Sequence, residues 1–315
     1  MAAAPRLKPM MSTELLDAAF RLYRSNFVTF LGIFAVIYVP ITLVVVAISG
    51  HFTSQAQAVL LGAVDDGSRK LAEQDLQMVQ TGITVLEMIL FALIAVPLAT
   101  GALTCAVGMR YLNEPASIGK AYRQILPMLF KYFVTTLLYG LVILLGFLLF
   151  LLPGLFLLFT GNLGVAGLAF VAGTPFSIVF GYRFMTWFFA ASSIVCLEGI
   201  GYTAAMGRSR ELVRGFGWRV FGFLFLTAML QGVLIGPVSV AAEFLFPLLT
   251  ESLALQFAMS TTLQQVLGMI ITPFFSTVLV LLYYDLRIRK EAFDLEVLAR
   301  NLGKSPPPET APAQP

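Results

Sequence analysis

Long apolar runs alternate with short polar segments along this chain, and the length of these runs is its main structural signal. Clear runs cover residues 27–50, 82–107, 221–240 and 263–283. A helix of about 20 apolar residues crosses the roughly 30 Å hydrocarbon core of a bilayer, so each run predicts one transmembrane helix. The pattern is typical of an all-α, polytopic membrane protein.

The stretch from residue 128 to residue 196 is almost continuously apolar, and hydropathy alone allows two or three spans there. Turn-forming residues interrupt it at Pro153-Gly154, Gly161-Asn162 and Gly173-Thr174-Pro175. The number of spans in this stretch has to come from another property, the distribution of charge.

Basic residues are confined almost entirely to four segments of the chain. Of the 20 lysines and arginines, only three lie outside residues 1–26, 108–131, 197–219 and 284–315, namely Arg69, Lys70 and Arg183. Because cytoplasmic loops carry an excess of Lys and Arg, we expect all four segments, including both termini, on the cytoplasmic side of a bacterial-type inner membrane. The second and third segments must then be separated by an even number of crossings.

We therefore expect two spans in the ambiguous stretch, at 128–152 and 176–196, which gives six spans in total. The residues between them, about 153–173, are expected to form a re-entrant or interface-lying hairpin on the outer side. Their glycines suit close packing within protein. The polar stretch 51–81 is expected to be an outer loop with a short surface helix around residues 68–79.

Each basic segment that precedes an odd-numbered span contains a short amphipathic helix, and the three segments align without gaps. Arg21 corresponds to Arg123, and Arg24 corresponds to Arg214. This suggests a three-fold repeat of one cytoplasmic interfacial helix plus two spans. We favour a role in anchoring the next span; the alternative is contact with anionic lipid headgroups or a partner. The candidate contacts are Arg21, Arg24, Lys120, Arg123, Arg208, Arg210, Arg214, Arg219, Arg287, Arg289 and Lys290.

Composition narrows the classes of function. The chain is 58% hydrophobic and 12% charged, whereas a soluble domain carries about 25% charged residues. The net charge of +3 is small and its basic residues are segregated by loop, so we expect membrane lipids and no nucleic acid as partners. Residues 1–11 are expected to be flexible, and the proline-rich tail 297–315 to be a disordered cytoplasmic segment.

The residues that usually carry catalysis or bind metals are scarce. His51 is the single histidine, and Cys105 and Cys196 lack the spacing of a metal or redox motif. No phosphate-binding loop with its lysine is present. We therefore expect no cofactor, no metal and no catalytic residue.

Ionisable residues within spans are functional candidates, because a charge in the bilayer core is costly. Arg183 lies within the fourth predicted span and Glu87 within the second, and both are closer to the outer end of their span. This candidate pair could line a substrate cavity. We favour the alternatives, in which the pair locks two spans together or Arg183 reaches the interface.

Three segments resemble a known family: ELVRGFGWRVFG at 211–222, LLYYDLRIRKEAFDLE at 281–296 and STELLDAAFRLYRSNF at 12–27. They are similar to the glycerophosphoryl diester phosphodiesterase membrane-domain-like family. The resemblance implies a six-span membrane protein. It transfers no catalytic residues, because the soluble phosphodiesterase barrel that some relatives carry has no counterpart here. The apolar insert at 153–173 departs from the family pattern.

The sequence thus favours a non-enzymatic membrane scaffold or accessory protein whose cytoplasmic helices engage lipid headgroups or a partner. The alternative is a transporter or exporter of a small or lipid-like molecule, with Arg183 near its cavity. A membrane enzyme ranks third, because convergent carboxylates and histidines are lacking.

Overall fold

The computed structural model describes residues 9–62, 65–159, 161, 163–293 and 295, and every regular element within them is a helix. In chain order these are α1 (Ser12–Ser25), α2 (Phe27–Gly62), α3 (Asp66–Leu90), the π-helical turn η1 (Phe91–Ala95), α4 (Val96–Tyr111), α5 (Ile118–Ile125), the 3-10 turn η2 (Leu126–Met128), α6 (Leu129–Phe159), α7 (Leu163–Phe188), α8 (Ala191–Glu198), α9 (Tyr202–Val213), α10 (Gly217–Leu249) and α11 (Leu253–Glu291).

Six helical segments are long and apolar enough to cross a membrane, which confirms the predicted number of spans. They correspond to α2, the continuous α3–η1–α4 segment, α5 with the first part of α6, α7 with α8, α10, and α11. Their lengths of 29 to 45 residues exceed the roughly 20 that a bilayer core requires. The helices therefore tilt or extend beyond the hydrocarbon layer.

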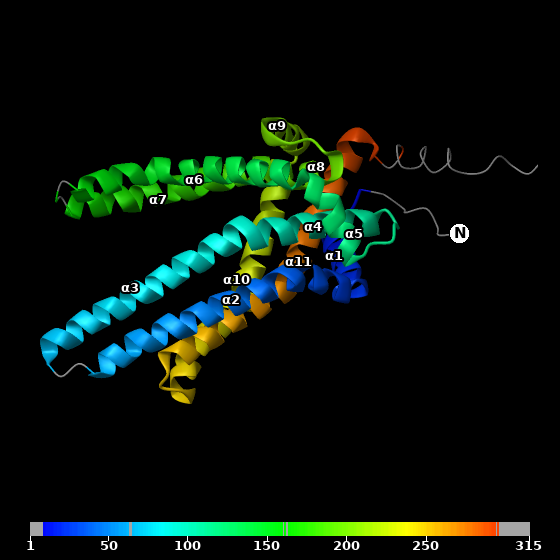
Figure 1. Cartoon of the computed structure of the whole chain (residues 1–315). Coiled ribbons are helices and arrows are strands. Elements are labelled where there is room, and N and C mark those ends of the chain that lie inside the picture. The colour runs from blue at the N-terminus through cyan, green and yellow to red at the C-terminus, as the bar shows by residue number, and fades with distance from the viewer. Residues whose placement is uncertain (1–8, 63–64, 160, 162, 294, 296–315) are drawn as a thin grey trace, which may run out of the picture.

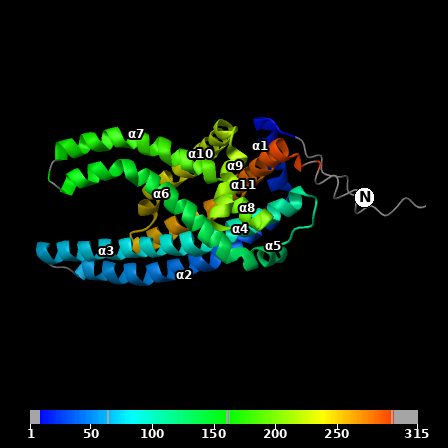
Figure 2. The same ribbon diagram turned by 90° about the horizontal axis from the view of Figure 1, so that it is seen from above.

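The long helices form three hairpins that meet at one end of the molecule. α2 pairs with α3, α6 with α7, and α10 with α11, and each hairpin follows a shorter helix, α1, α5 or α9 (Figure 1). All three shorter helices, α8 and the C-terminal end of α11 lie at the shared end. From this end the α2–α3 and α6–α7 hairpins diverge, as the second view also shows (Figure 2).

The core lies at the shared end, where α2, α4 and α11 pack together. Its largest fully buried side chains include Phe30, Phe34, Leu103, Leu281 and Tyr283. Farther along the hairpins many large apolar side chains are exposed. Such surfaces are stable where lipid tails cover them.

Within the described residues the polar stretch after the first span is helical rather than a loop, and the short helix expected around residues 68–79 lies within the longer α3. α2 continues to Gly62 and α3 begins at Asp66, so this stretch forms the tip of the first hairpin. The start of α3 is fixed by Asp65, whose carboxylate accepts hydrogen bonds from Ser68 and the Gly67 backbone, and these bonds lower the pKa of Asp65. Asp65, an N-cap residue, was therefore the sequence signal that marks the start of this helix.

The described residues of the insert at 153–173 continue the two flanking helices, whereas the sequence predicted a re-entrant or interfacial hairpin separate from the spans. α6 continues through Pro153 to Phe159, and α7 begins at Leu163. Gly154 lets the two helices approach closely: a Cβ there would lie 2.9–3.0 Å from three atoms of the Phe170 ring. Packing between the two helices thus outweighs the helix-breaking tendency of Pro and Gly.

Substituting Gly154 by alanine is expected to destabilise the α6–α7 hairpin by about 1–3 kcal/mol, because the new methyl group overlaps the Phe170 ring. Gly140 on the same helix is the matched control, since a Cβ there meets nothing within 4 Å. Cys105 and Cys196 are buried, so a thiol-reactive dye reports thermal unfolding in detergent. Equal melting temperatures for G154A and G140A would contradict the close packing.

The expectation of a flexible segment up to residue 11 fails at Met10, which is buried and bonded to α10 and α11 through its backbone. Residues 1–8 lie outside the described residues, as does the tail 297–315.

Candidate functional site

A buried carboxylate joins the N-terminal segment to the last two spans. Asp285 of α11 has no exposed side-chain area. It accepts hydrogen bonds from the Met10 backbone N–H at 2.8 Å, from Arg219 Nε at 3.2 Å and from Arg289 Nε at 2.9 Å. Both arginines also donate to the Met10 carbonyl. Two predicted headgroup contacts, Arg219 and Arg289, are therefore engaged in holding the structure together.

A second ionic cluster links α8, α9 and α11. Glu198 accepts from the Tyr283 hydroxyl at 2.6 Å and from Arg208 Nε at 3.2 Å. Glu291 pairs with Arg208 at 2.6 Å and with Arg287 at 3.1 Å. Burial lowers the pKa of Arg208, but the two carboxylates outweigh this effect and raise the pKa from its usual value. Arg208 and Arg287 thus also have structural roles.

The remaining predicted contacts differ in surroundings. Arg21, Arg24 and Arg123 are exposed and make no ion pair within the described residues. Lys120 donates to the Pro115 carbonyl at 3.4 Å, and Lys290 donates to the Glu211 carbonyl. This leaves Arg210 and Arg214, which meet Arg183 around a cavity.

The predicted pair of Arg183 with Glu87 does not form. Glu87 on α3 accepts from Gln265 of α11 at 2.9 Å, whereas the Arg183 guanidinium lies 4.8 Å from the Trp187 ring centroid, one turn along α7. Membrane depth suggested the pairing, but α3 and α7 belong to different hairpins (Figure 1).

Three arginines gather around a cavity of about 570 Å³ between α7, α9 and the turn that leads into α10. Arg183, Arg210 and Arg214 line this arginine pocket together with Trp187. Arg210 lies 4.7 Å from the Trp187 ring centroid, a distance close to that of Arg183. The acidic residue Glu211 also lines the pocket. Within the described residues none of the three arginines makes an ion pair.

A break in the fourth span sets the position of α9 beside Trp187. α7 ends at Phe188 and α8 begins at Ala191, so backbone groups at the break lack their helical partners. The buried Ser209 of α9 supplies them: its hydroxyl donates to the Trp187 carbonyl at 2.8 Å and accepts from the Ala190 N–H at 3.2 Å. The next residue along α9, Arg210, thereby reaches the ring.

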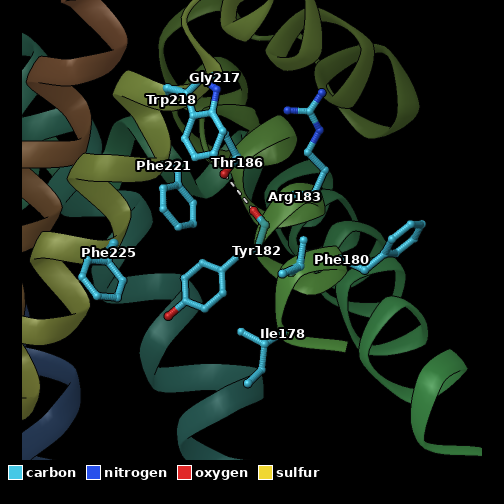
Figure 3. A pocket seen from close by; sticks show the side chains of 10 residues that line it. Ile178, Phe180, Tyr182, Arg183, Thr186, Gly217, Trp218, Phe221 and Phe225 are labelled. Carbon is cyan, nitrogen blue, oxygen red and sulfur yellow. Dashed lines mark hydrogen bonds between the residues drawn. The ribbon is translucent and has the colours of Figure 1, made fainter. Parts of the chain in front are cut away.

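An apolar groove of about 520 Å³ continues from the arginine pocket between α7 and α10. Arg183 and Gly217 line both cavities. In Figure 3 these two residues lie at one end of the groove, with Ile178 and Phe225 toward the other. Thr186 turns its hydroxyl to the Tyr182 carbonyl at 2.7 Å, so it presents little unpaired polarity. Other lining residues are Val179, Phe180, Tyr182, Trp218 and Phe221.

This arrangement combines a cationic end with an apolar wall. Guanidinium groups bind phosphate and carboxylate oxygens, often in a bidentate manner, and an apolar groove lined by aromatic rings holds hydrocarbon. Sequence reasoning had identified Arg183 as an intramembrane candidate and Arg210 and Arg214 as candidate headgroup or partner contacts, without placing the three together. It had missed Trp187, although its position four residues after Arg183 on a helix signals a same-face contact.

Comparisons of the chain with protein-family models, with curated proteins and with solved structures found no match.

Proposed function

We propose that this protein is a non-enzymatic accessory protein of a bacterial-type inner membrane that binds anionic lipid headgroups on its cytoplasmic side. The observation that carries the proposal is the arginine pocket, where Arg183, Arg210 and Arg214 surround a cavity with Glu211 as the acidic lining residue. Three positive charges against one negative charge favour an anionic ligand. The pocket lies at the end where the basic helices α1, α5 and α9 gather.

Two further features support this proposal. The proposed orientation, with six spans and both termini cytoplasmic, follows from the one-sided distribution of Lys and Arg. The order of one short helix and one hairpin, found three times along the chain, supports a repeat of the kind proposed from the aligned basic segments. Membership of the glycerophosphoryl diester phosphodiesterase membrane-domain-like family is part of the same proposal, on the motifs quoted above.

Reversing the charge of Arg210 and Arg214 together tests the proposal. Both side chains are exposed and make no ion pair within the described part of the chain, so R210E/R214E should fold, and Arg208 is left intact because of its ion pairs. Mass spectrometry of lipids retained in polymer-extracted particles should show enrichment of anionic over zwitterionic lipid falling about tenfold.

The matched control is R69E/K70E, the same change of charge at the exposed tip of the α2–α3 hairpin. It should leave the enrichment close to that of the unmodified protein. Unchanged enrichment in R210E/R214E, or an equal loss in both variants, would contradict headgroup binding in the arginine pocket.

Transport of a lipid-like molecule is the second candidate, favoured by the groove between α7 and α10 that adjoins Arg183. Movement of a fluorescent anionic lipid between leaflets of reconstituted vesicles separates the two. A rate above that of protein-free vesicles, lost in R210E/R214E, would favour the transporter, whereas binding without movement would favour the accessory protein.

A further inference from the structure

We propose that the arginine pocket and the apolar groove form one site for a single phosphate-bearing lipid, with the phosphate among the arginines and an acyl chain between α7 and α10. This inference rests on the proposed function and deepens it, because headgroup binding alone needs no groove. It assigns the ligand class, an anionic phospholipid, and the route of entry, sideways from the leaflet.

Continuity of the two cavities is the first argument. Arg183 belongs to both, and its Nη1 lies 3.6 Å from the position that a Cβ on Gly217 would occupy. Arg183 and Gly217 therefore mark the junction at which the two parts of the site meet. Each cavity also falls within the roughly 300–1,000 Å³ typical of ligand sites.

The chemistry of the cationic end is the second argument. Three guanidinium groups offer more donors than one carboxylate can accept, whereas a phosphate presents several oxygens for bidentate contacts. Gly217 is also the first residue of α10, a helix of 33 residues, so the positive end of its dipole adds to the field in the pocket. The Trp187 ring lies 4.8 Å from the Arg183 guanidinium and 4.7 Å from that of Arg210, and cation–π attraction favours both groups near the ring.

The nature of the groove wall is the third argument. Trp218, Phe221 and Phe225 lie along α10, and Ile178 and Tyr182 face them from α7 (Figure 3). Such a wall offers a polar solute few hydrogen-bonding groups, chiefly the Tyr182 hydroxyl and the Trp218 indole N–H, whereas a hydrocarbon chain replaces bulk lipid there at little cost. Charge at one end and apolar surface along the rest match a lipid rather than a soluble anion.

The chain's two tryptophans report on the two parts of the site, because Trp187 lines the arginine pocket and Trp218 lines the groove. Because Trp187 contacts Arg183 and Arg210, it is kept, and quenching of the combined fluorescence of the two tryptophans is measured. The full chain is placed in nanodiscs of phosphatidylcholine that contain a brominated probe, either phosphatidic acid or phosphatidylcholine with bromine on its acyl chains. Quenching by the phosphatidic acid should reach its half-maximum at about tenfold lower mole fraction.

A groove-filling variant separates the inference from the proposed function. Val179 lines the groove and is 70% exposed, so the larger side chain in Val179→Phe should exclude the acyl chain from the groove without disturbing the protein core. The control is Val171→Phe on the same helix, at a residue of 74% exposure outside the groove. The preference for brominated phosphatidic acid should disappear in the first variant and persist in the second.

Each outcome is decisive. If Val179→Phe keeps the preference for brominated phosphatidic acid, the acyl chain does not occupy the groove and the inference is overturned. Lipid enrichment that depends on Arg210 and Arg214 would still support the proposed function. If millimolar inorganic phosphate displaces the lipid as effectively as added phosphatidic acid does, the site binds a soluble anion and the inference is also overturned. Loss of the preference in Val179→Phe alone, with no competition by phosphate, supports it.

Discussion

Replacing Asp285 with alanine is expected to destabilise the protein by about 3–5 kcal/mol, the largest effect of any single substitution considered. The substitution leaves Arg219 and Arg289 facing each other without a counter-ion, in surroundings where their side chains are only 21% and 26% exposed. It also removes the acceptor of the buried Met10 N–H. Labelling of the two buried cysteines should shift to lower temperature by roughly 10 °C.

Two comparisons isolate the cause of this effect. Asp285→Asn keeps one acceptor oxygen but not the charge and should lie between alanine and the unmodified protein. Asp17→Ala removes an exposed carboxylate from α1 and should change stability by less than about 0.5 kcal/mol. If Asp17→Ala cost as much as Asp285→Ala, burial and pairing at Asp285 would not explain the loss.

Glu198→Ala should cause the second largest loss, about 3 kcal/mol. Tyr283 then loses its hydrogen-bond acceptor at 2.6 Å, and Arg208 loses one of its two carboxylates. Because Arg208 ties α9 to α8 and α11, this variant should also displace the arginines of α9 and weaken lipid retention. Thermal unfolding and the lipid-enrichment assay measure the two effects.

Glu291→Ala is the informative comparison for this cluster. It also removes a carboxylate from Arg208 and Arg287, but Glu198 remains beside both arginines and keeps the Tyr283 hydrogen bond. We expect less than half the loss seen for Glu198→Ala. A larger loss from Glu291→Ala would show that the cluster centres on the end of α11 instead.

The number of spans could be predicted from the sequence because it depends on two robust quantities, the length of apolar runs and the side on which charges collect. The conformation of the insert could not. Pro153 and Gly154 indicated a break, yet whether a helix survives proline depends on what packs against it. Here Phe170, sixteen residues farther along, decides the outcome, and no local pattern contains that contact.

The candidate site shows the same division. Sequence reasoning identified Arg183 as an unusual charge within a span but paired it with Glu87 because both were expected at a similar depth in the membrane. Depth does not determine which neighbour each helix faces. The arginines of α9 were grouped, although Arg208 and Arg210 lie about 200° apart around a helix of 3.6 residues per turn. That angle places Arg208 in the ionic cluster and Arg210 in the arginine pocket, so helical periodicity alone could have separated their roles.

The divergence of the hairpins makes each of them a lever arm. α6 has 31 residues, so it is about 46 Å long, and a rotation of about 5° at the shared end displaces its tip by about 4 Å. The arginine pocket lies at the pivot of the α6–α7 arm, between α7 and α9. A lipid that tilts α7 by a few degrees there would move the α6–α7 tip by several ångströms, so the far end of the hairpin would report whether the pocket is occupied.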